Sequence, residues 1–280
     1  MALNPPVVLT IAGFDPSAGA GITADTKTIA AHSCYGVACI TALTVQSTAG
    51  VKRVEPVDPG LVRETLTDMA SDFEIAAIHI GMLGTAGVAG AVADFLKSSG
   101  LKNVVVDPVL RSSSGTDLLD AAGIKVLLER ILPLSTVITP NIFEAKVLTG
   151  VEVTGKPDMI AAAQKLHKLG GPAVVVTGGH LDKAVDLLSF DGGKSQESFT
   201  SQRQESKSTH GTGCAFSTAL ACHLALGRGL PEAVMLAKIY VSAAISHGQP
   251  IGRGVGPVNH LYRMAQPRRV GQRDPEPVGH

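Results

Sequence analysis

The amino-acid sequence predicts an α/β protein with a largely parallel central sheet, helices on both faces and a small antiparallel hairpin at the sheet edge. Three observations support this prediction. Short runs rich in β-branched residues alternate with helical segments along most of the chain. The runs are continuously apolar, which is typical of strands buried on both faces. Glycine, proline, aspartate and asparagine mark the boundaries between the two kinds of segment.

The first half of the chain supplies four predicted strands and three predicted helices. The strands are expected at residues 7–12, 37–43, 76–80 and 104–106. The helices are expected at residues 23–35, 58–70 and 85–100. Asp58 followed by Pro59 makes a favourable N-cap and first turn, and Thr85 is another N-cap. Gly36 is expected at the C′ position that ends the first helix.

The second half continues the alternation. The further predicted elements are a helix capped by Asp120, a strand at 137–138, a short helix from Asn141, a helix at 161–169 and a strand at 173–176. Two Ala-rich helices end the fold, one at 214–226 and one that Pro231 opens and that runs to about residue 247.

The alternation breaks once, in the predicted antiparallel hairpin. Residues 185–190 and 198–200 are joined by Asp-Gly-Gly and are expected to pair at the sheet edge. The sequence shows no internal repeat and no linker, so residues 1–265 are expected to form one domain. The polar, Pro-rich residues 266–280 are expected to be disordered.

Composition and charge limit the kinds of partner. The chain has 280 residues, of which 45% are hydrophobic, and this is enough for a substantial core. Lys+Arg and Asp+Glu both number 24, so the net charge is zero, and no basic stripe indicates nucleic acid or an anionic membrane. The sequence shows no signal peptide or membrane span, and its four scattered cysteines fit a reducing compartment. We therefore expect a small-molecule partner and a cytoplasmic location.

Two familiar nucleotide-binding motifs do not fit the sequence. The G-x-G-x-x-A segment from Gly19 to Ala24 follows a strand, but the loop before its first glycine is too long. The second strand also ends without the acidic residue of the dinucleotide fingerprint. The Gly-Lys-Ser segment at 193–195 lacks the earlier glycine of a phosphate loop and lies in the predicted hairpin turn. Any nucleotide must therefore be bound by another device.

The segment THGTGCAF, residues 209–216, is the strongest candidate for that device. Gly211 and Gly213, on either side of Thr212, remove side chains where a loop turns into an apolar helix. Backbone N–H groups at such a helix start can point at an anion. Cys214 stands at the same N-terminus, where the positive potential is expected to favour its thiolate. Cys214 is therefore a candidate base or nucleophile.

Polar or small residues, and in one case a methionine, follow most of the predicted strands. In strand order these are Gly13 with Asp15, Gln46, Met82, Asp107, Asn141 and residues 177–180. Ligands of open α/β sheets bind at this edge, so a shared crevice is expected there. The alternative is that single residues are turn formers, which suits Asp107 before Pro108 and Asn141 after Pro140. Asp25 lies one turn inside the first helix, where we expect it to face the crevice.

Asn141 and Glu144 lie on neighbouring positions of one helix face. An amide and a carboxylate in this arrangement can order the water shell of Mg²⁺, which takes few direct protein ligands. The alternative is a capping box, with Asn141 as N-cap and Glu144 at N3, and both can hold together. None of the nine histidines shows a convincing metal-ligand spacing, so no structural zinc is expected.

Five sequence blocks combine these features: TIAGFDPSAGAGITADTKT, ITALTVQST, IHIGMLGT, ITPNIFEA and STHGTGCAFSTALA. Together they resemble the hydroxymethylpyrimidine and phosphomethylpyrimidine kinase family of thiamine biosynthesis, over about residues 7–265. The resemblance implies the ribokinase-like α/β fold, a homodimer, and MgATP as phosphoryl donor. It further implies that ATP phosphorylates the hydroxymethyl group of 4-amino-5-hydroxymethyl-2-methylpyrimidine and then the resulting monophosphate.

The resemblance also implies which residues bind the acceptor. Gly13 and Thr44 would offer backbone groups to the pyrimidine. The side chains of Asp25 and Gln46 would form hydrogen bonds with it, and Met82 would line the ring pocket.

On the donor side, the resemblance places Asp107, Asn141 and Glu144 near the triphosphate and Mg²⁺. Residues 211–213 would form the anion hole. Cys214 would stand where many relatives in the wider ribokinase group have a catalytic aspartate. The expected reaction is in-line transfer with Cys214 as base for the first phosphorylation and no covalent phospho-enzyme.

One residue departs from the family pattern. Members often carry a lysine before a GGH sequence, positioned to meet the ATP phosphates, and this chain has Thr177 there. A hydroxyl supplies a hydrogen bond but no charge, so phosphate neutralisation would depend more on Mg²⁺, the helix start and Lys238. The polar residues 201–208, just before the anion loop, are a candidate flap over the substrate.

Two other functions stay open at this point. A pyridoxal kinase on the same frame is the nearer alternative, because pyridoxal also carries a hydroxymethyl group on a heteroaromatic ring. Gln46 and Met82 favour the pyrimidine, by resemblance. The other alternative is a non-catalytic nucleotide- or vitamin-binding regulator, against which Cys214 and the Asn141–Glu144 pair argue.

Overall fold

The computed structural model describes residues 4–112, 114–179, 184–201, 204 and 206–264. The strands are β1 (Val7–Phe14), β2 (Tyr35–Ser47), β3 (Gly50–Pro56), β4 (Ile75–Ile80), β5 (Val104–Val106), β6 (Val137–Ile138), β7 (Val174–Val176), β8 (Ala184–Phe190) and β9 (Ser195–Ser201). The α-helices are α1 (Gly21–Ala31), α2 (Pro59–Asp72), α3 (Ala86–Ser99), α4 (Ala121–Val126), α5 (Ile142–Thr149), α6 (Lys156–Lys168), α7 (Thr212–Ala225) and α8 (Leu230–Ser246). Three short helical turns, η1 (Leu127–Ile131), η2 (Leu132–Leu134) and η3 (Asp191–Gly193), complete the list.

The strands of the described part form one sheet with the order β3-β2-β1-β4-β5-β6-β7-β8-β9. The parallel part of the sheet consists of β2, β1, β4, β5, β6 and β7. Strand β3 at one edge and strands β8 and β9 at the other pair antiparallel. The largely parallel sheet that the sequence predicts is therefore confirmed, as is the hairpin of β8 and β9.

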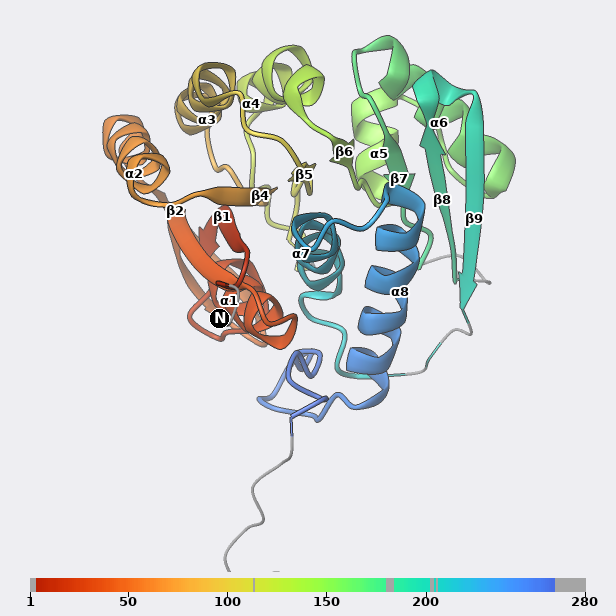
Figure 1. Ribbon diagram of the computed structural model, residues 1–280. Coiled ribbons are helices and arrows are strands. Elements are labelled where there is room, and N and C mark those ends of the chain that lie inside the picture. Colours follow the sequence, from red (N-terminus) through yellow and green to blue (C-terminus); the bar gives the residue numbers. More distant parts are fainter. Residues whose placement is uncertain (1–3, 113, 180–183, 202–203, 205, 265–280) are drawn as a thin grey trace, which may run out of the picture.

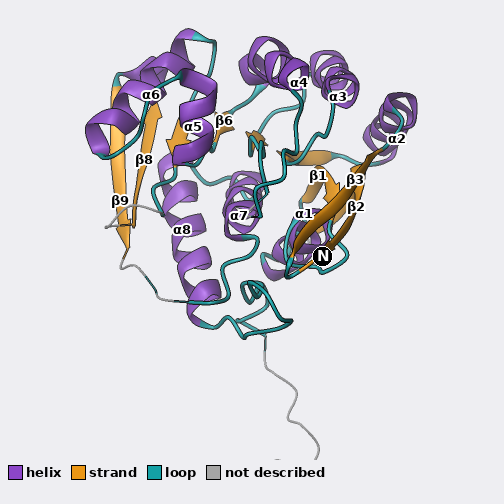
Figure 2. Cartoon of the chain, turned by 180° about the vertical axis from the view of Figure 1, so that it is seen from behind, coloured by secondary structure: helices purple, strands orange, loops and turns teal. Residues whose placement is uncertain are grey.

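Helices cover both faces of this sheet, as the continuously apolar strands require. Helices α2 to α6 lie along one face, at the top of the view in Figure 1, and α1, α7 and α8 lie on the other; Figure 2 shows the same two layers from behind. Each layer encloses its own apolar cluster. Alternate residues of β1 enter different clusters, because Leu9 and Ile11 face one layer and Val8 faces the other. Each fully buried Leu or Ile stabilises the fold by about 1.5–3 kcal/mol.

The predicted N-caps of the helices on the first face are present. The Asp58 carboxylate accepts hydrogen bonds from the N–H groups at the start of α2, and the Thr85 hydroxyl accepts one from the start of α3. Asp120 caps α4 through the N–H of Gly123. Gly100 ends α3 with a positive φ of 61°, which glycine adopts with little strain.

Several boundary predictions were wrong. Helix α6 begins at Lys156 rather than at residue 161, because Pro157 is favourable in the first turn of a helix. The first helix ends at Ala31 rather than near residue 35, because Ser33 turns the chain with φ = 57° so that Tyr35 can begin β2. Gly36 therefore lies in β2 and not at a helix C-terminus. A second antiparallel hairpin, which was not predicted, also interrupts the alternation of strands and helices. Beyond Leu43, β2 continues and folds back antiparallel on β3, and the side chains there alternate between the two faces.

The remaining structural predictions concern segments that the structure does not test. Residues 266–280 lie outside the described residues, so the predicted disordered tail and the single domain at 1–265 stay predictions. The predicted flap at 201–208 lies partly outside them as well. In the described ranges, no helix combines the length and the apolar character needed to cross a membrane.

Three histidines, His32, His223 and His260, are buried near the contact of α1, α7 and α8. Their Nε2 atoms have no hydrogen-bond partner within the described part of the chain. Burial lowers the pKa of His223 and of His260 to about 4, and it lowers the pKa of His32 as well. The rings of His223 and His260 are therefore neutral in the folded protein at neutral pH.

Acid is expected to destabilise the fold through these rings. Because the folded pKa of His260 lies below the unfolded value of about 6.5, the unfolded chain binds the proton first as the pH falls. The stabilisation is complete above about pH 6.5 and is lost as the pH falls towards 4, by about 3 kcal/mol for His260. Urea unfolding of the unmodified chain and of His260→Gln over this range measures the effect. The variant should show the smaller decline in the free energy of unfolding, and parallel declines would contradict the prediction.

Candidate active site

A cavity of about 830 Å³ lies at the C-terminal edge of the parallel strands. Of the predicted site residues, those that line it are Gly13, Thr44, Gln46, Met82, Asp107, Asn141, Glu144, Gly211, Thr212, Gly213 and Cys214. Asp25, Thr177 and Lys238 are not part of its lining. The structure therefore brings most of the predicted residues to the shared crevice that the strand ends indicate.

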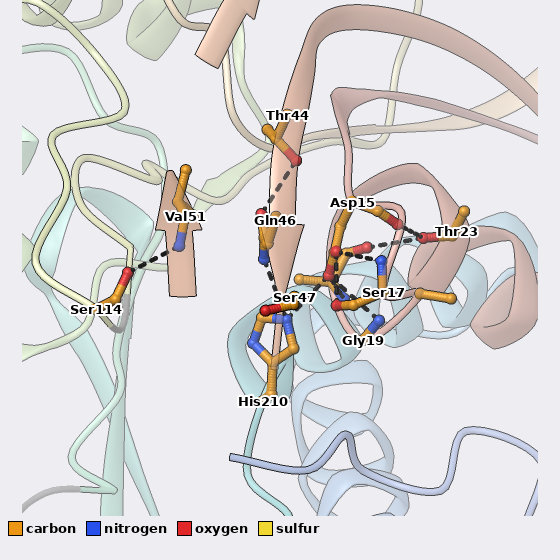
Figure 3. Close-up of polar contacts among 12 residues, drawn as sticks. Asp15, Ser17, Gly19, Thr23, Thr44, Gln46, Ser47, Val51, Ser114 and His210 are labelled. Carbon is orange, nitrogen blue, oxygen red and sulfur yellow. Dashed lines mark hydrogen bonds and ion pairs between the residues drawn. The ribbon is translucent and has the colours of Figure 1, made fainter. Parts of the chain in front are cut away.

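Asp15 organises the loop that follows β1. Its carboxylate accepts hydrogen bonds from the N–H and hydroxyl of Ser17 at 2.8 and 2.7 Å and from the N–H of Ala20 at 2.9 Å. Nε2 of His210 lies 2.9 Å from the same carboxylate (Figure 3). Burial acts to raise the pKa of Asp15, but the hydrogen bonds from His210, Ser17 and Ala20 outweigh burial and lower the pKa. Asp15 is therefore an ionised residue that shapes the loop.

His210 connects this loop to β2. Gln46 Nε2 lies 3.3 Å from His210 Nε2, and Gln46 Oε1 lies 3.2 Å from Thr44 Oγ1 (Figure 3). Because the Asp15 carboxylate is ionised and can only accept, His210 Nε2 must be protonated and donate its hydrogen bond to Asp15. The same nitrogen then cannot accept a hydrogen bond from the Gln46 amide. The Gln46 amide nitrogen therefore makes no hydrogen bond to this ring nitrogen, and the Gln46 amide lines the cavity.

Helix α7 begins where two glycine-containing loops touch. Gly211 adopts φ = 81°, and a Cβ at this position would overlap the carbonyl oxygen of Gly19. A Cβ on Gly19 would in turn overlap the ring of His210. Helix geometry leaves the N–H groups of Gly213 and Cys214 without intrahelical acceptors, and both residues line the cavity. The helix start has the geometry that the sequence predicts for an anion site.

Two acids lie in the same cavity wall, Asp107 after β5 and Glu144 in the first turn of α5, and both are buried. Burial raises the pKa of Asp107 to about 6, with the neighbouring His79 and Ser217 opposing the change. Burial and the charge of Asp107 raise the pKa of Glu144 well above its ordinary value. A cation in the cavity would relieve this cost, so the pair fits a divalent ion such as Mg²⁺.

Asn141 and Glu144 also form the capping box considered as the alternative. The Asn141 N–H donates to Glu144 Oε2 at 2.9 Å, and the Glu144 N–H donates to Asn141 Oδ1 at 2.9 Å. No group of three or more His, Cys, Asp or Glu side chains in the described ranges is placed to hold a metal ion. A cation here would therefore need water or ligand oxygens in addition to the two carboxylates, which is usual for Mg²⁺.

Cys214 is a thiol in the protein without ligands. Burial and the charges of Asp107 and Asp25 raise its pKa well above the ordinary value, and the N–H of Gly21 acts in the opposite direction. The expectation that the helix N-terminus favours the thiolate is not borne out in this state, because burial and the surrounding carboxylates act against it. Cys214 can serve as a base only where those negative charges are compensated.

Asp25 lies beneath the cavity wall and does not face the crevice. It shares one face of α1 with Ile22 and Ile29, and this buried face packs on the sheet and α7. The carboxylate is fully buried and accepts hydrogen bonds from Thr10 Oγ1 at 2.7 Å and from Thr218 Oγ1 at 2.9 Å. The geometry thus gives no support to the direct hydrogen bond with the acceptor that the resemblance implies.

Lys238 and Thr177 also lie away from the cavity lining. Lys238 Nζ lies 2.7 Å from Asp186 Oδ2 in a largely buried ion pair, and Asp186 also accepts a hydrogen bond from the N–H of Gly178 at 3.0 Å. The positive charge of Lys238 is therefore already balanced, which leaves little support for its expected role against a phosphate.

Arg111 is the one Lys or Arg side chain that lines the cavity in the part of the chain described by the structure. Its Nε donates to Asp117 at 2.8 Å, and its guanidinium lies 4.9 Å from the centre of the Phe143 ring. The same loop reaches the β2–β3 turn, where the Val51 N–H donates to Ser114 Oγ at 3.2 Å (Figure 3). No sequence motif pointed to Arg111.

Sequence comparison places this chain among well-defined relatives. Residues 15–259 match the family described as phosphomethylpyrimidine kinase. The hydroxymethylpyrimidine/phosphomethylpyrimidine kinase of Haemophilus influenzae is 42% identical over 261 residues, which cover 90% of this chain and 96% of that protein. The thiamine biosynthesis bifunctional protein ThiED of Geobacter sulfurreducens is 45% identical over 256 residues, covering 91% of this chain. The match covers 52% of that protein, so the chain spans about half its length.

Structure comparison adds a second kind of relative. An ADP complex of Bacillus subtilis pyridoxal kinase has a TM-score of 0.84 and 38% sequence identity. The match covers 92% of this chain and 98% of that one. Both activities considered from the sequence are thus represented among the relatives.

Proposed function

The chain belongs to the phosphomethylpyrimidine kinase family, and from this premise we propose that it uses ATP to phosphorylate 4-amino-5-hydroxymethyl-2-methylpyrimidine and then the resulting monophosphate. The fold is ribokinase-like, as the sequence predicts, and the chain is a small-molecule kinase. The observation that carries the proposal is the single cavity in which Cys214 and the open N-terminus of α7 meet Gln46, Met82 and the buried acids.

The acceptor is proposed to lie beside Met82, with its ring polar groups on the Gln46 amide and on backbone groups of Gly13 and Thr44. Its hydroxymethyl oxygen then lies towards Cys214. In the first step this oxygen attacks the γ-phosphorus of ATP, the bond to the β,γ-bridging oxygen breaks, and ADP leaves. The hydroxyl proton passes to the Cys214 thiolate, which would form once bound Mg²⁺ compensates the negative charges of the neighbouring carboxylates. In the second step the attacking atom is an ionised phosphate oxygen, which has no proton to give up.

The donor phosphates are proposed to lie at the start of α7, where the N–H groups of Gly213 and Cys214 stabilise charge that develops on the transferring group. Asp107, Glu144 and the Asn141 side chain would hold Mg²⁺ with its waters, and the ion would neutralise donor oxygens. Arg111 is proposed to supply the positive charge that Thr177 lacks and that Lys238 gives to Asp186. Its own ion pair with Asp117 is exposed and therefore weak, whereas the pair of Lys238 with Asp186 is largely buried.

Steady-state ADP release with three acceptors tests the proposal. We expect turnover with the pyrimidine alcohol and with its monophosphate, and a lower kcat/KM with pyridoxal. A higher kcat/KM with pyridoxal would make the chain a pyridoxal kinase, an activity found in its Bacillus subtilis structural relative. Tight binding without turnover of any acceptor would indicate the regulator.

The homodimer and the cytoplasmic location stay predictions that rest on the resemblance and on composition. Sedimentation velocity measures the first directly, and a monomer at working concentrations would contradict it.

A further inference from the structure

A fully buried histidine lies between the acceptor and donor sides of the cavity. His79 is on β4, beneath α7, and has no exposed surface. Its Nδ1 lies 3.2 Å from Thr10 Oγ1 and 3.4 Å from the carboxylate of Asp25. Its Nε2 lies 3.0 Å from Ser217 Oγ, and that hydroxyl lies 3.2 Å from Asp107 Oδ2. One polar chain thus runs from α1 to the acid that follows β5.

The donors and acceptors in this series of side chains determine which atoms of His79 carry protons. The Thr10 hydroxyl donates its proton to Asp25 at 2.7 Å, so Nδ1 of His79 must be the donor in its contacts with Thr10 and Asp25. The single Ser217 hydroxyl proton has three acceptors within reach, Asp107 Oδ2 at 3.2 Å and the carbonyl oxygens of Gly213 at 3.0 Å and Cys214 at 3.2 Å. The charged Asp107 carboxylate is the strongest of these acceptors, and when Ser217 donates to it the Ser217 oxygen accepts from Nε2–H of His79. Both ring nitrogens then carry protons, and the imidazolium lies between two carboxylates. Burial disfavours this charge, but Asp25 and Asp107 outweigh burial and raise the pKa of His79.

We propose that His79 is a positioning residue that acts through Ser217 to hold the Asp107 carboxylate in the orientation that a divalent cation needs. The bond from Ser217 engages Oδ2 of Asp107 and leaves the other oxygen for the ion. Side chains that hydrogen-bond to a metal ligand in this way fix the orientation of that ligand and tune its charge. The inference rests on the proposed function for the presence of a cation at Asp107. It extends that function to two residues that do not touch the cation.

The rival explanation is that His79 only fills space in the core. Ser217→Ala separates the two explanations, because it removes the hydroxyl link and leaves the imidazole in place. Ser189→Ala is a matched control, since Ser189 is a fully buried serine whose hydroxyl lies 3.0 Å from Nε2 of another histidine, His167, away from the cavity. Both variants lose a Ser–His contact of the same length, so a general loss of stability should affect them alike.

The experiment is titration of the full chain with Mn²⁺ in the presence of ADP, followed by electron paramagnetic resonance of the free ion. We expect Ser217→Ala and His79→Gln each to weaken Mn²⁺ binding about tenfold or more, while Ser189→Ala does not. The double variant should bind about as weakly as His79→Gln alone, because the two residues act in one chain. Should His79→Gln fail to fold, the comparison of the two serine variants decides alone.

Equal Mn²⁺ affinities for Ser217→Ala, Ser189→Ala and the unmodified chain would overturn the proposal, as would additive losses in the double variant. Absence of Mn²⁺ binding by the unmodified chain with ADP would also overturn it. The titration contains no acceptor, so it separates this inference from the choice of substrate. Weakened Mn²⁺ binding in a chain that phosphorylates neither pyrimidine would retain the positioning role and remove the proposed function.

Discussion

Cys214→Ala is expected to lower kcat for the pyrimidine alcohol by about a hundredfold to ten-thousandfold, the usual scale for removal of a general base. Phosphorylation of the monophosphate should fall much less, because its attacking oxygen is already ionised. Steady-state kinetics of the purified variant with each acceptor measures the two rates. Equal losses with both acceptors would remove the base role and leave Cys214 as part of the cavity wall.

The pH dependence provides a second measure of the same role. Burial and the charges of Asp107 and Asp25 raise the pKa of the Cys214 thiol, so the base form becomes more populated as the pH rises. The rate with the alcohol should therefore rise with pH above neutrality in the unmodified enzyme, and this rise should disappear in Cys214→Ala. Cys222→Ala is the control, because Cys222 lies on the same helix but is fully buried away from the cavity. It should retain the pH profile and the ratio of the two rates.

The sequence predicts most of the fold because local signals and the sheet pattern agree. Asp58, Thr85 and Asp120 cap helices where side-chain oxygens follow a loop, and the triple valines at 104–106 and 174–176 are strands that only a doubly covered sheet can bury. The β2–β3 hairpin was missed because its β2 half carries on beyond an apolar run with a weaker alternating pattern. Leu43 and Val45 are half exposed there, so burial does not dominate that sequence.

The residues that line the cavity were predictable where the course of the backbone decides their position. Gly13, Gln46, Met82 and Asp107 line the cavity because the ends of parallel strands share one edge. Side-chain direction was harder to predict. Asp25 is one turn inside α1, but its place on the buried face of the helix turns it to the core.

Residues that act through long-range contacts left only weak signals in the sequence. His79 interrupts an otherwise apolar strand, which is a sign of a buried polar partner, but Ser217 and Asp107 are far from it in sequence. His210 meets Asp15 across 195 positions. The pairing of Lys238 with Asp186 likewise depends on tertiary structure, and it removes a charge that the sequence offered to a phosphate. Such pairings are set by packing and not by local pattern.

Substitution of Gly211, which precedes α7, is expected to have the second large effect on activity. Gly211→Ala is expected to reduce both phosphorylations by about a hundredfold to a thousandfold, the scale seen when a charge-stabilising N–H donor is lost. The added Cβ would overlap the carbonyl oxygen of Gly19, so the two loops must separate. Separation moves the N–H groups of Gly213 and Cys214 away from the transferring phosphoryl group, which both reactions need.

Gly227→Ala is the matched control for backbone strain. Gly227 follows the other end of α7 with φ = 80°, nearly the value of 81° at Gly211, but a Cβ there meets nothing within 4 Å. Both substitutions should lower the free energy of unfolding by about 1–2 kcal/mol from the left-handed conformation alone. Only Gly211→Ala should add the cost of the overlap and the loss of both activities. If urea unfolding and kinetics show the two variants to be alike, the contact between the loops does not position the helix start, and phosphate stabilisation must come mainly from Mg²⁺ and Arg111.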